Sequence, residues 1–266
     1  MSRPLTSKGL FVSVVAILGV LSMPVKACEE KLGIAYQTGG DGRLHILVNE
    51  VTLHPDLASS QGNWIAPDLL LPGENTLEIV LSGPEGVANA KTEIFVGCEG
   101  VFPDAPGENA ESLLLTEIDT PGRVSEAFFY DDVPGYVYLN AEPTDDDGLE
   151  AAIEDLRKVA RSGDVAGFLT YHDPLLHDAR LVHPEREGLL NHMAMLFLTS
   201  GDFDVMAPKE ITIKPVLGGR AYQAIDPSGQ GPLRFVGKDG SESAGQTIAQ
   251  ARIWMKTAEG WRVLRN

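Results

Sequence analysis

The segment 148-GLEAAIEDLRKVARSGD-164 and the paired runs 246-QTIAQARIWMKT-257 and 260-GWRVLRN-266 decide the fold expected for the C-terminal half of this 266-residue chain. The first segment has the apolar spacing of an amphipathic helix, and the two runs are strand-like and joined by a tight turn. Helices followed by strands are typical of an α+β domain, whose helices cover one face of an antiparallel sheet. We therefore predict an α+β domain over residues 149–266.

The other elements of this domain follow from the same patterns. The first helix has one apolar stripe, made by Leu149, Ile153, Leu156 and Ala160. Asp164 can cap a second helix over 165–172, and Pro184 suits the first position of a third. The residues that the third helix is predicted to bury are Leu189, Met193, Leu196 and Phe197. Strands are expected at 209–216, 220–225, 233–237, 246–257 and 260–266.

The order of these segments resembles a known superfamily. A long helix, the segment 160-ARSGDVAGFLTYHDP-174, a helix after 183-HPEREG-188 and the closing 251-ARIWMKTAEGWRVLRN-266 are similar to the nuclear transport factor 2-like superfamily, which includes ketosteroid isomerase. The most specific part is Ile253-Trp254 followed by Gly260-Trp261-Arg262-Val263. The resemblance implies a cone in which three helices wrap one curved antiparallel sheet, with a pocket at its open end.

Such a pocket implies an apolar ligand fixed by a few polar groups. The isomerases of the superfamily use a carboxylate base beside a tyrosine and a protonated acid, and this chain does not show that set in register. The candidates for acid or base are Tyr171, His172, Asp173 and His177. The strand residues that would contact a ligand, or else pack beneath the helices, are Tyr222, Arg252 and Trp254.

Histidine is concentrated in one stretch of this domain. Four of the six histidines lie between residues 172 and 192. A cluster of histidines and carboxylates can bind zinc or hold a general base near neutral pH. However, no HExxH or similar fixed spacing is present. We therefore expect no metal site and no cofactor, and structural or surface roles are the alternative to catalysis.

Residues 28–140 are expected to form a separate domain, with residues 141–148 as the linker. Their strand-like runs lie between Gly and Pro turns and lack a helical period, which is typical of an antiparallel β-sandwich. In 43-RLHILVNEV-51, for example, every second residue is apolar, as in a half-buried strand. Trp64, in the loop 60–68, is a candidate ligand-binding residue that would stack on a sugar or a peptide. The alternative is that it closes the open end of the sandwich.

Residues 1–27 have the composition of a secretory signal peptide. Arg3 and Lys8 precede the apolar run 9–23, and small residues follow up to Ala27. The apolar run is shorter than the roughly 20 residues that span a bilayer. We therefore predict cleavage after Ala27 and a periplasmic or secreted protein of bacterial origin, with no membrane attachment after cleavage.

Cys28 and Cys98 are the only cysteines in the chain. An exported protein meets an oxidising compartment, so a disulfide between them is one prediction. The alternative is a lipid anchor on Cys28, because Val25-Lys26-Ala27-Cys28 resembles a bacterial lipobox except at Lys26.

Removal of the signal segment, with its three basic residues, leaves 18 basic against 38 acidic residues and a formal charge of -20. Such a chain repels nucleic acid, so no nucleic acid partner is expected. The leading prediction is a non-catalytic binding or protein-interaction protein, whose partner is a protein or a small apolar ligand. The alternative is an isomerase, dehydratase or hydrolase that acts on a small molecule. A homodimer is also compatible with this fold.

Overall fold

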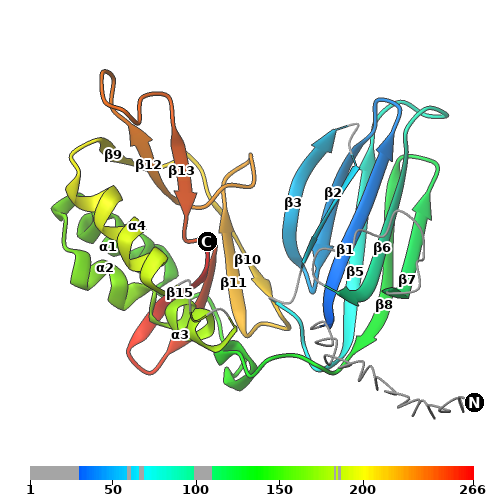
Figure 1. Ribbon diagram of the computed structural model, residues 1–266, viewed down its shortest axis with the longest axis horizontal. Coiled ribbons are helices and arrows are strands. Elements are labelled where there is room, and N and C mark those ends of the chain that lie inside the picture. Colours follow the sequence, from blue (N-terminus) through cyan, green and yellow to red (C-terminus); the bar gives the residue numbers. More distant parts are fainter. Residues whose placement is uncertain (1–29, 59–60, 66–68, 99–109, 183, 185–186) are drawn as a thin grey trace, which may run out of the picture.

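The computed structural model describes residues 30–58, 61–65, 69–98, 110–182, 184 and 187–266 (Figure 1). The predicted signal peptide and Cys28 lie outside the described residues, so the predictions of export and lipidation remain untested. Of the helices described, none is long and apolar enough to span a bilayer.

The N-terminal part consists of two antiparallel four-stranded sheets. Their strand orders are β4-β1-β6-β7 and β3-β2-β5-β8. The strands are β1 (Glu30–Gly39), β2 (Arg43–Val48), β3 (Val51–Ala58), β4 (Gln61–Ile65), β5 (Gly73–Ser82), β6 (Asn89–Cys98), β7 (Ala110–Ile118) and β8 (Gly122–Tyr130). Alternate residues point to opposite faces of a strand, so every second residue of β2 is buried. These residues pack with those of β1, β5 and β6 into one core between the sheets.

The helices follow a short connection. A 3₁₀ helix, η1 (Val137–Asn140), lies in this connection. The α-helices are α1 (Leu149–Ser162), α2 (Val165–Tyr171), α3 (Asp173–Val182) and α4 (Glu187–Thr199). The predicted apolar stripe of α1 is confirmed, since all four of its residues are buried. The predicted cap of α2 is also confirmed, because the Asp164 carboxylate accepts a hydrogen bond from the Gly167 amide at 3.0 Å.

The last seven strands form two further antiparallel sheets. The strands are β9 (Phe203–Met206), β10 (Thr212–Val216), β11 (Ala221–Ile225), β12 (Leu233–Gly237), β13 (Thr247–Gln250), β14 (Ile253–Thr257) and β15 (Gly260–Arg265). The sheet orders are β10-β11-β14-β15 and β13-β12-β9. Helices α1, α2 and α4 share one apolar core with both sheets. The predicted cone of three helices on one curved sheet is therefore wrong, because four short helices accompany two separate sheets.

A bend at Ala251 explains why the expected strand over 246–257 is two strands in two sheets. Ala251 has φ of 64°, in the left-handed region that side chains other than glycine rarely adopt. Its amide donates to the Asn266 side chain at 3.0 Å, and its carbonyl accepts from the Trp254 indole at 2.6 Å. A contact with the last residue of the chain and a local contact with Trp254, three residues on, thus hold a conformation that alanine rarely adopts.

The sheet β10-β11-β14-β15 is covered on both faces. Tyr222, Ala224 and Trp254 belong to the core beneath the helices. Their neighbours in the chain, such as Ala221 and Ile253, pack instead with Tyr136 and Tyr138 of the connection and with Val51 of the N-terminal part. The N-terminal and C-terminal parts therefore share a core, and the outer face of this sheet is occupied within the chain.

Candidate functional site

The four candidate catalytic residues lie around the α2–α3 junction. Within the part of the chain that the structure describes, none of their side chains hydrogen-bonds to the side chain of another. Asp173 is exposed at the start of α3. Tyr171 is half-buried against Trp254, with the Arg262 guanidinium over its ring, and burial raises the pKa of its phenol. A raised pKa keeps Tyr171 protonated at neutral pH.

His172 belongs to the protein core. Its ring stacks on Phe168 at 4.3 Å between centroids, and its Nδ1 lies 2.8 Å from the Phe168 carbonyl oxygen. A carbonyl only accepts hydrogen bonds, so Nδ1 carries the proton. Nε2 is buried with no hydrogen-bond partner among the described residues. Burial lowers the pKa of His172 to about 4, which keeps the ring neutral at physiological pH.

His177 lies on the exposed side of α3, with its side chain 57% exposed. Its Nδ1 is 3.4 Å from Oδ1 of Asp178, longer than an ordinary hydrogen bond. Asp178 itself is buried and is held by Arg265 at 2.8 Å and by the Val137 amide at 3.0 Å. The carboxylate beside His177 thus has a structural role between α3, η1 and β15.

Two of the predicted ligand-binding residues are core residues. Trp254 is fully buried, and Tyr222 packs edge-on against Trp261. The Tyr222 hydroxyl donates to the Thr144 carbonyl at 2.7 Å, which fastens the 141–148 segment to β11. Both side chains are explained by packing beneath the helices.

Arg252, the third predicted strand residue, joins the two parts of the chain. Its Nη2 donates to the Thr52 carbonyl of β3 at 2.6 Å, and burial lowers its pKa. The Gln223 amide donates to the same carbonyl at 3.2 Å and accepts from the Thr52 amide at 3.1 Å. Lys214 donates to the Thr52 hydroxyl at 3.2 Å. Three side chains of the C-terminal part thus surround one residue of the N-terminal part.

We expect Gln223→Ala to lower the free energy of unfolding by about 2 kcal/mol, because the buried Thr52 amide would lose its acceptor. Chemical denaturation of the purified protein measures this. Gln37→Ala, which removes an exposed glutamine from β1, is the control and should change little. Equal stability of the two variants would show that the junction is not held by these bonds.

Two earlier predictions fall partly outside the described residues. Trp64 lies on strand β4, paired with Ile34, and not in a loop as predicted; its side chain is not among those described. The proposed disulfide involves Cys28, which is also outside. The strand register pairs Cys98 with Glu30, two residues from Cys28, and the disulfide stays a prediction.

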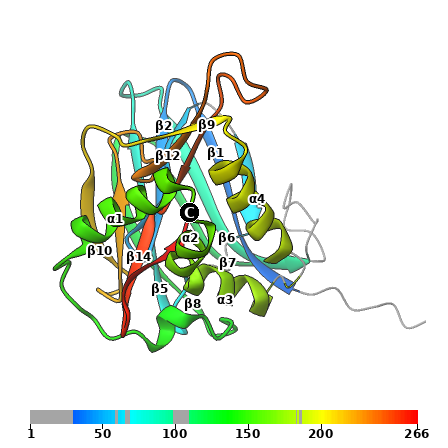
Figure 2. The same cartoon turned by 90° about the vertical axis from the view of Figure 1, so that its left-hand side faces the viewer.

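The feature that the sequence did not predict is an exposed apolar face on α4. The exposed residues along this helix include Leu189, His192, Met195, Leu196 and Thr199, and we call this set the α4 face. Leu189 and Met195 are 56% and 54% exposed, and Leu196 is 43% exposed. The prediction that Leu189 and Leu196 would be buried is therefore wrong. Figures 1 and 2 show α4 at the margin of the helical layer, beside α2 and α3.

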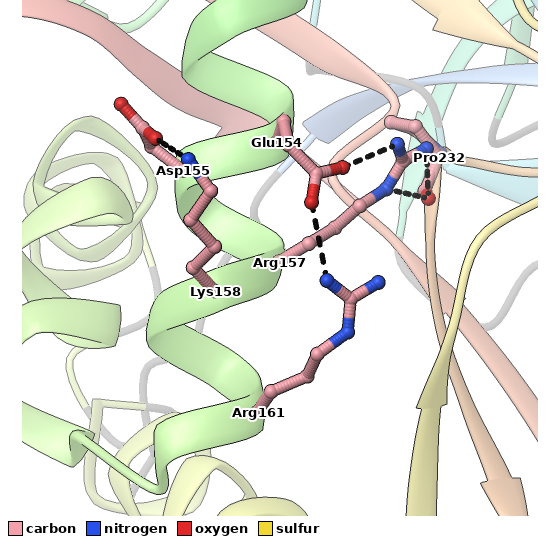
Figure 3. A network of polar contacts seen from close by, with 6 residues as sticks. All are labelled: Glu154, Asp155, Arg157, Lys158, Arg161 and Pro232. Atoms are coloured by element: carbon pink, nitrogen blue, oxygen red, sulfur yellow. Dashed lines mark hydrogen bonds and ion pairs between the residues drawn. The ribbon is translucent and has the colours of Figure 1, made fainter.

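Helix α1 differs from α4 in the charge of its outward side. Its outward side carries charged residues in contact with one another (Figure 3). Arg157 donates twice to the Pro232 carbonyl, at 3.1 and 2.9 Å, and Arg157 and Arg161 both contact Glu154. Lys158 contacts Asp155 at 2.8 Å. By contrast, no Asp, Glu, Lys or Arg occurs from Gly188 to Gly201.

The described residues contain no group of three or more His, Cys, Asp or Glu side chains placed to hold a metal ion. No family model, curated protein or solved structure matches this chain. The resemblance to the nuclear transport factor 2-like superfamily therefore remains a prediction.

Proposed function

We propose that this chain is an exported, non-catalytic interaction protein that binds another protein through the α4 face. The observation that carries the proposal is the exposure of Leu189, Met195 and Leu196 on one side of a helix. Eight large apolar residues are exposed in the described part of the chain, and three of them lie on α4. Isolated exposed apolar residues are ordinary, but a contiguous group marks an interaction site.

The spacing of these residues supports recognition by packing. Leu189, His192, Leu196 and Thr199 recur at intervals of three or four residues, so they lie in one row along the helix. Leucines spaced along one side of a helix, such as Leu189 and Leu196, are the residues that enter a partner's groove or pack on a partner's helix. Methionine is also enriched at protein interfaces, and Met195 lies beside the row.

The positions of the acid–base candidates support binding over catalysis. His172 has its Nδ1 proton on a backbone carbonyl inside the core, and Asp173 is directed to solvent. The carboxylate next to His177 is engaged by Arg265. In this arrangement the residues expected to act as acid and base have structural or solvated environments.

Site-specific photo-crosslinking in the cells that produce the protein tests this function. A photoreactive phenylalanine analogue in place of Met195 should give covalent adducts to protein under illumination. The same analogue in place of Lys158, whose side chain is 65% exposed on the charged side of α1, is the control and should give few. Adducts at the background level from both positions would refute the proposed function.

A further inference from the structure

We propose that the α4 face pairs with the α4 face of a second copy of this chain, to form a two-fold symmetric dimer. This inference rests on the proposed function, because it names the partner for the same face. In such a dimer the two identical patches contact each other, so any charge in the patch meets its own symmetry mate or a close neighbour.

The charge distribution favours a second copy. The chain carries a formal charge of -17, or -20 without its first 27 residues, so two copies repel each other over most of their surfaces. From Gly188 to Gly201 the sequence contains no Asp, Glu, Lys or Arg. Two α4 faces can therefore approach without placing like charges opposite each other.

The fold leaves the α4 face exposed, whereas it covers the outer face of the sheet β10-β11-β14-β15. The outer face of this sheet is another broad surface on which a second copy would have to be considered. Here that face packs on Tyr136, Tyr138 and Val51 of the same chain. The exposed side of α4 has no such cover among the described residues, since its leucines remain about half exposed.

The spacing along α4 fits antiparallel pairing with its own copy. With the two-fold axis near Ala194, Leu189 of one copy lies opposite Thr199 of the other, and His192 lies opposite Leu196. Each leucine of one copy then lies opposite a threonine or a histidine of the other, and the row of one helix can pack into the groove beside the row of the other. Because one helix of 13 residues provides most of the area, we expect a weak dimer that forms at micromolar concentration.

Sedimentation velocity of the mature protein, over concentrations up to about 100 µM, measures the association. We expect the wild type to dimerise and Leu196→Asp to dimerise at least about 10-fold more weakly, because each new carboxylate would have to lose its hydration inside the contact. The matched control is Leu115→Asp on β7, since Leu115 is 46% exposed and Leu196 is 43% exposed. That variant should dimerise like the wild type.

Salt dependence and crosslinking give independent readouts. Raising the salt from about 0.05 to about 0.5 M screens the repulsion between acidic chains, so association should strengthen, whereas an ion-paired interface would weaken. In a second experiment, an equimolar mixture of the His192→Cys and Leu196→Cys proteins should yield a disulfide-linked dimer on mild oxidation, because these two positions lie opposite each other, whereas Lys158→Cys should not. Circular dichroism of each variant verifies that it is folded.

Each outcome is decisive for one of the two proposals. A wild type that stays monomeric, or a Leu196→Asp variant that dimerises like the wild type, overturns the second copy as partner. If the photo-crosslinks from position 195 then lead to a different protein, the proposed function stands without the dimer. If position 195 gives no adducts at all, both proposals fail.

Discussion

Replacing Asp178 with alanine is expected to lower the free energy of unfolding by about 3–5 kcal/mol, the largest effect of any single substitution predicted for this chain. Asp178 and Arg265 form an ion pair at 2.8 Å, with side chains only 3% and 8% exposed. Removal of the carboxylate would take away a counter-charge that lies at 2.8 Å from the buried guanidinium. The Val137 amide would lose its acceptor at the same time.

The Asp178–Arg265 pair connects three elements, so its loss would destabilise more than one part of the fold. Asp178 lies on α3, Arg265 on the last strand, and Val137 in η1, which connects the two parts of the chain. The Arg265 guanidinium also lies 5.2 Å from the centre of the Tyr136 ring, which belongs to the shared core. The substitution would therefore weaken the helical layer, the C-terminal strand and the junction together.

Denaturation with urea measures the loss, and two variants control for its cause. The double variant Asp178→Leu with Arg265→Met replaces both charges with apolar groups and should recover much of the stability. Asp155→Ala removes an exposed carboxylate paired with Lys158 and should have little effect. If Asp178→Ala behaved like Asp155→Ala, the buried pair would not stabilise the fold.

The sequence was sufficient to predict the elements in which the spacing of apolar residues defines the buried side. The stripe of α1 and the alternation of β2 place Leu149, Ile153, Leu44 and Ile46 in cores, as the structure confirms. In these cases, polar residues occupy the opposite side, so the period alone defines which side is buried.

The α4 face could not be predicted because the helix has apolar residues around most of its circumference. Phe197 and Ala194 are buried while Leu196 and Leu189 are exposed, and no polar side distinguishes the two sets. The available signal was the absence of charge from Gly188 to Gly201 in a strongly acidic chain. That signal indicates an unusual surface, but it does not show which side of the helix carries it.

Contacts between distant residues account for the other differences. The bend at Ala251 depends on the Asn266 side chain, 15 positions away, and the Asp178–Arg265 pair joins residues 87 positions apart. The role of Arg252 likewise depends on Thr52, which is 200 positions away. Because no local spacing encodes such partners, the sequence indicated Arg252 as a candidate for ligand contact and gave no signal for the Asp178–Arg265 pair.

The last prediction is that His172 makes the protein less stable in acid, by roughly 3 kcal/mol at pH 4 relative to pH 8. In the unfolded chain a histidine has a pKa of about 6.5. In the folded protein, burial lowers the pKa of His172 to about 4. Between these two values the unfolded state binds a proton that the folded state excludes. The contribution of His172 to the free energy of unfolding is therefore fully present above about pH 6.5 and declines as the pH falls toward 4.

Denaturation curves at several pH values between about 4 and 8 test this, with variants that isolate the histidine. Carboxylates also titrate in this range, so the useful quantity is the difference between proteins. His172→Phe should remove about 3 kcal/mol of the acid-dependent loss, even if its stability at pH 8 changes. His177→Asn, which replaces the exposed histidine of α3, should keep the wild-type slope. An unchanged slope in His172→Phe would mean that His172 accepts a proton in the folded protein, and that its environment permits the acid–base role first considered for it.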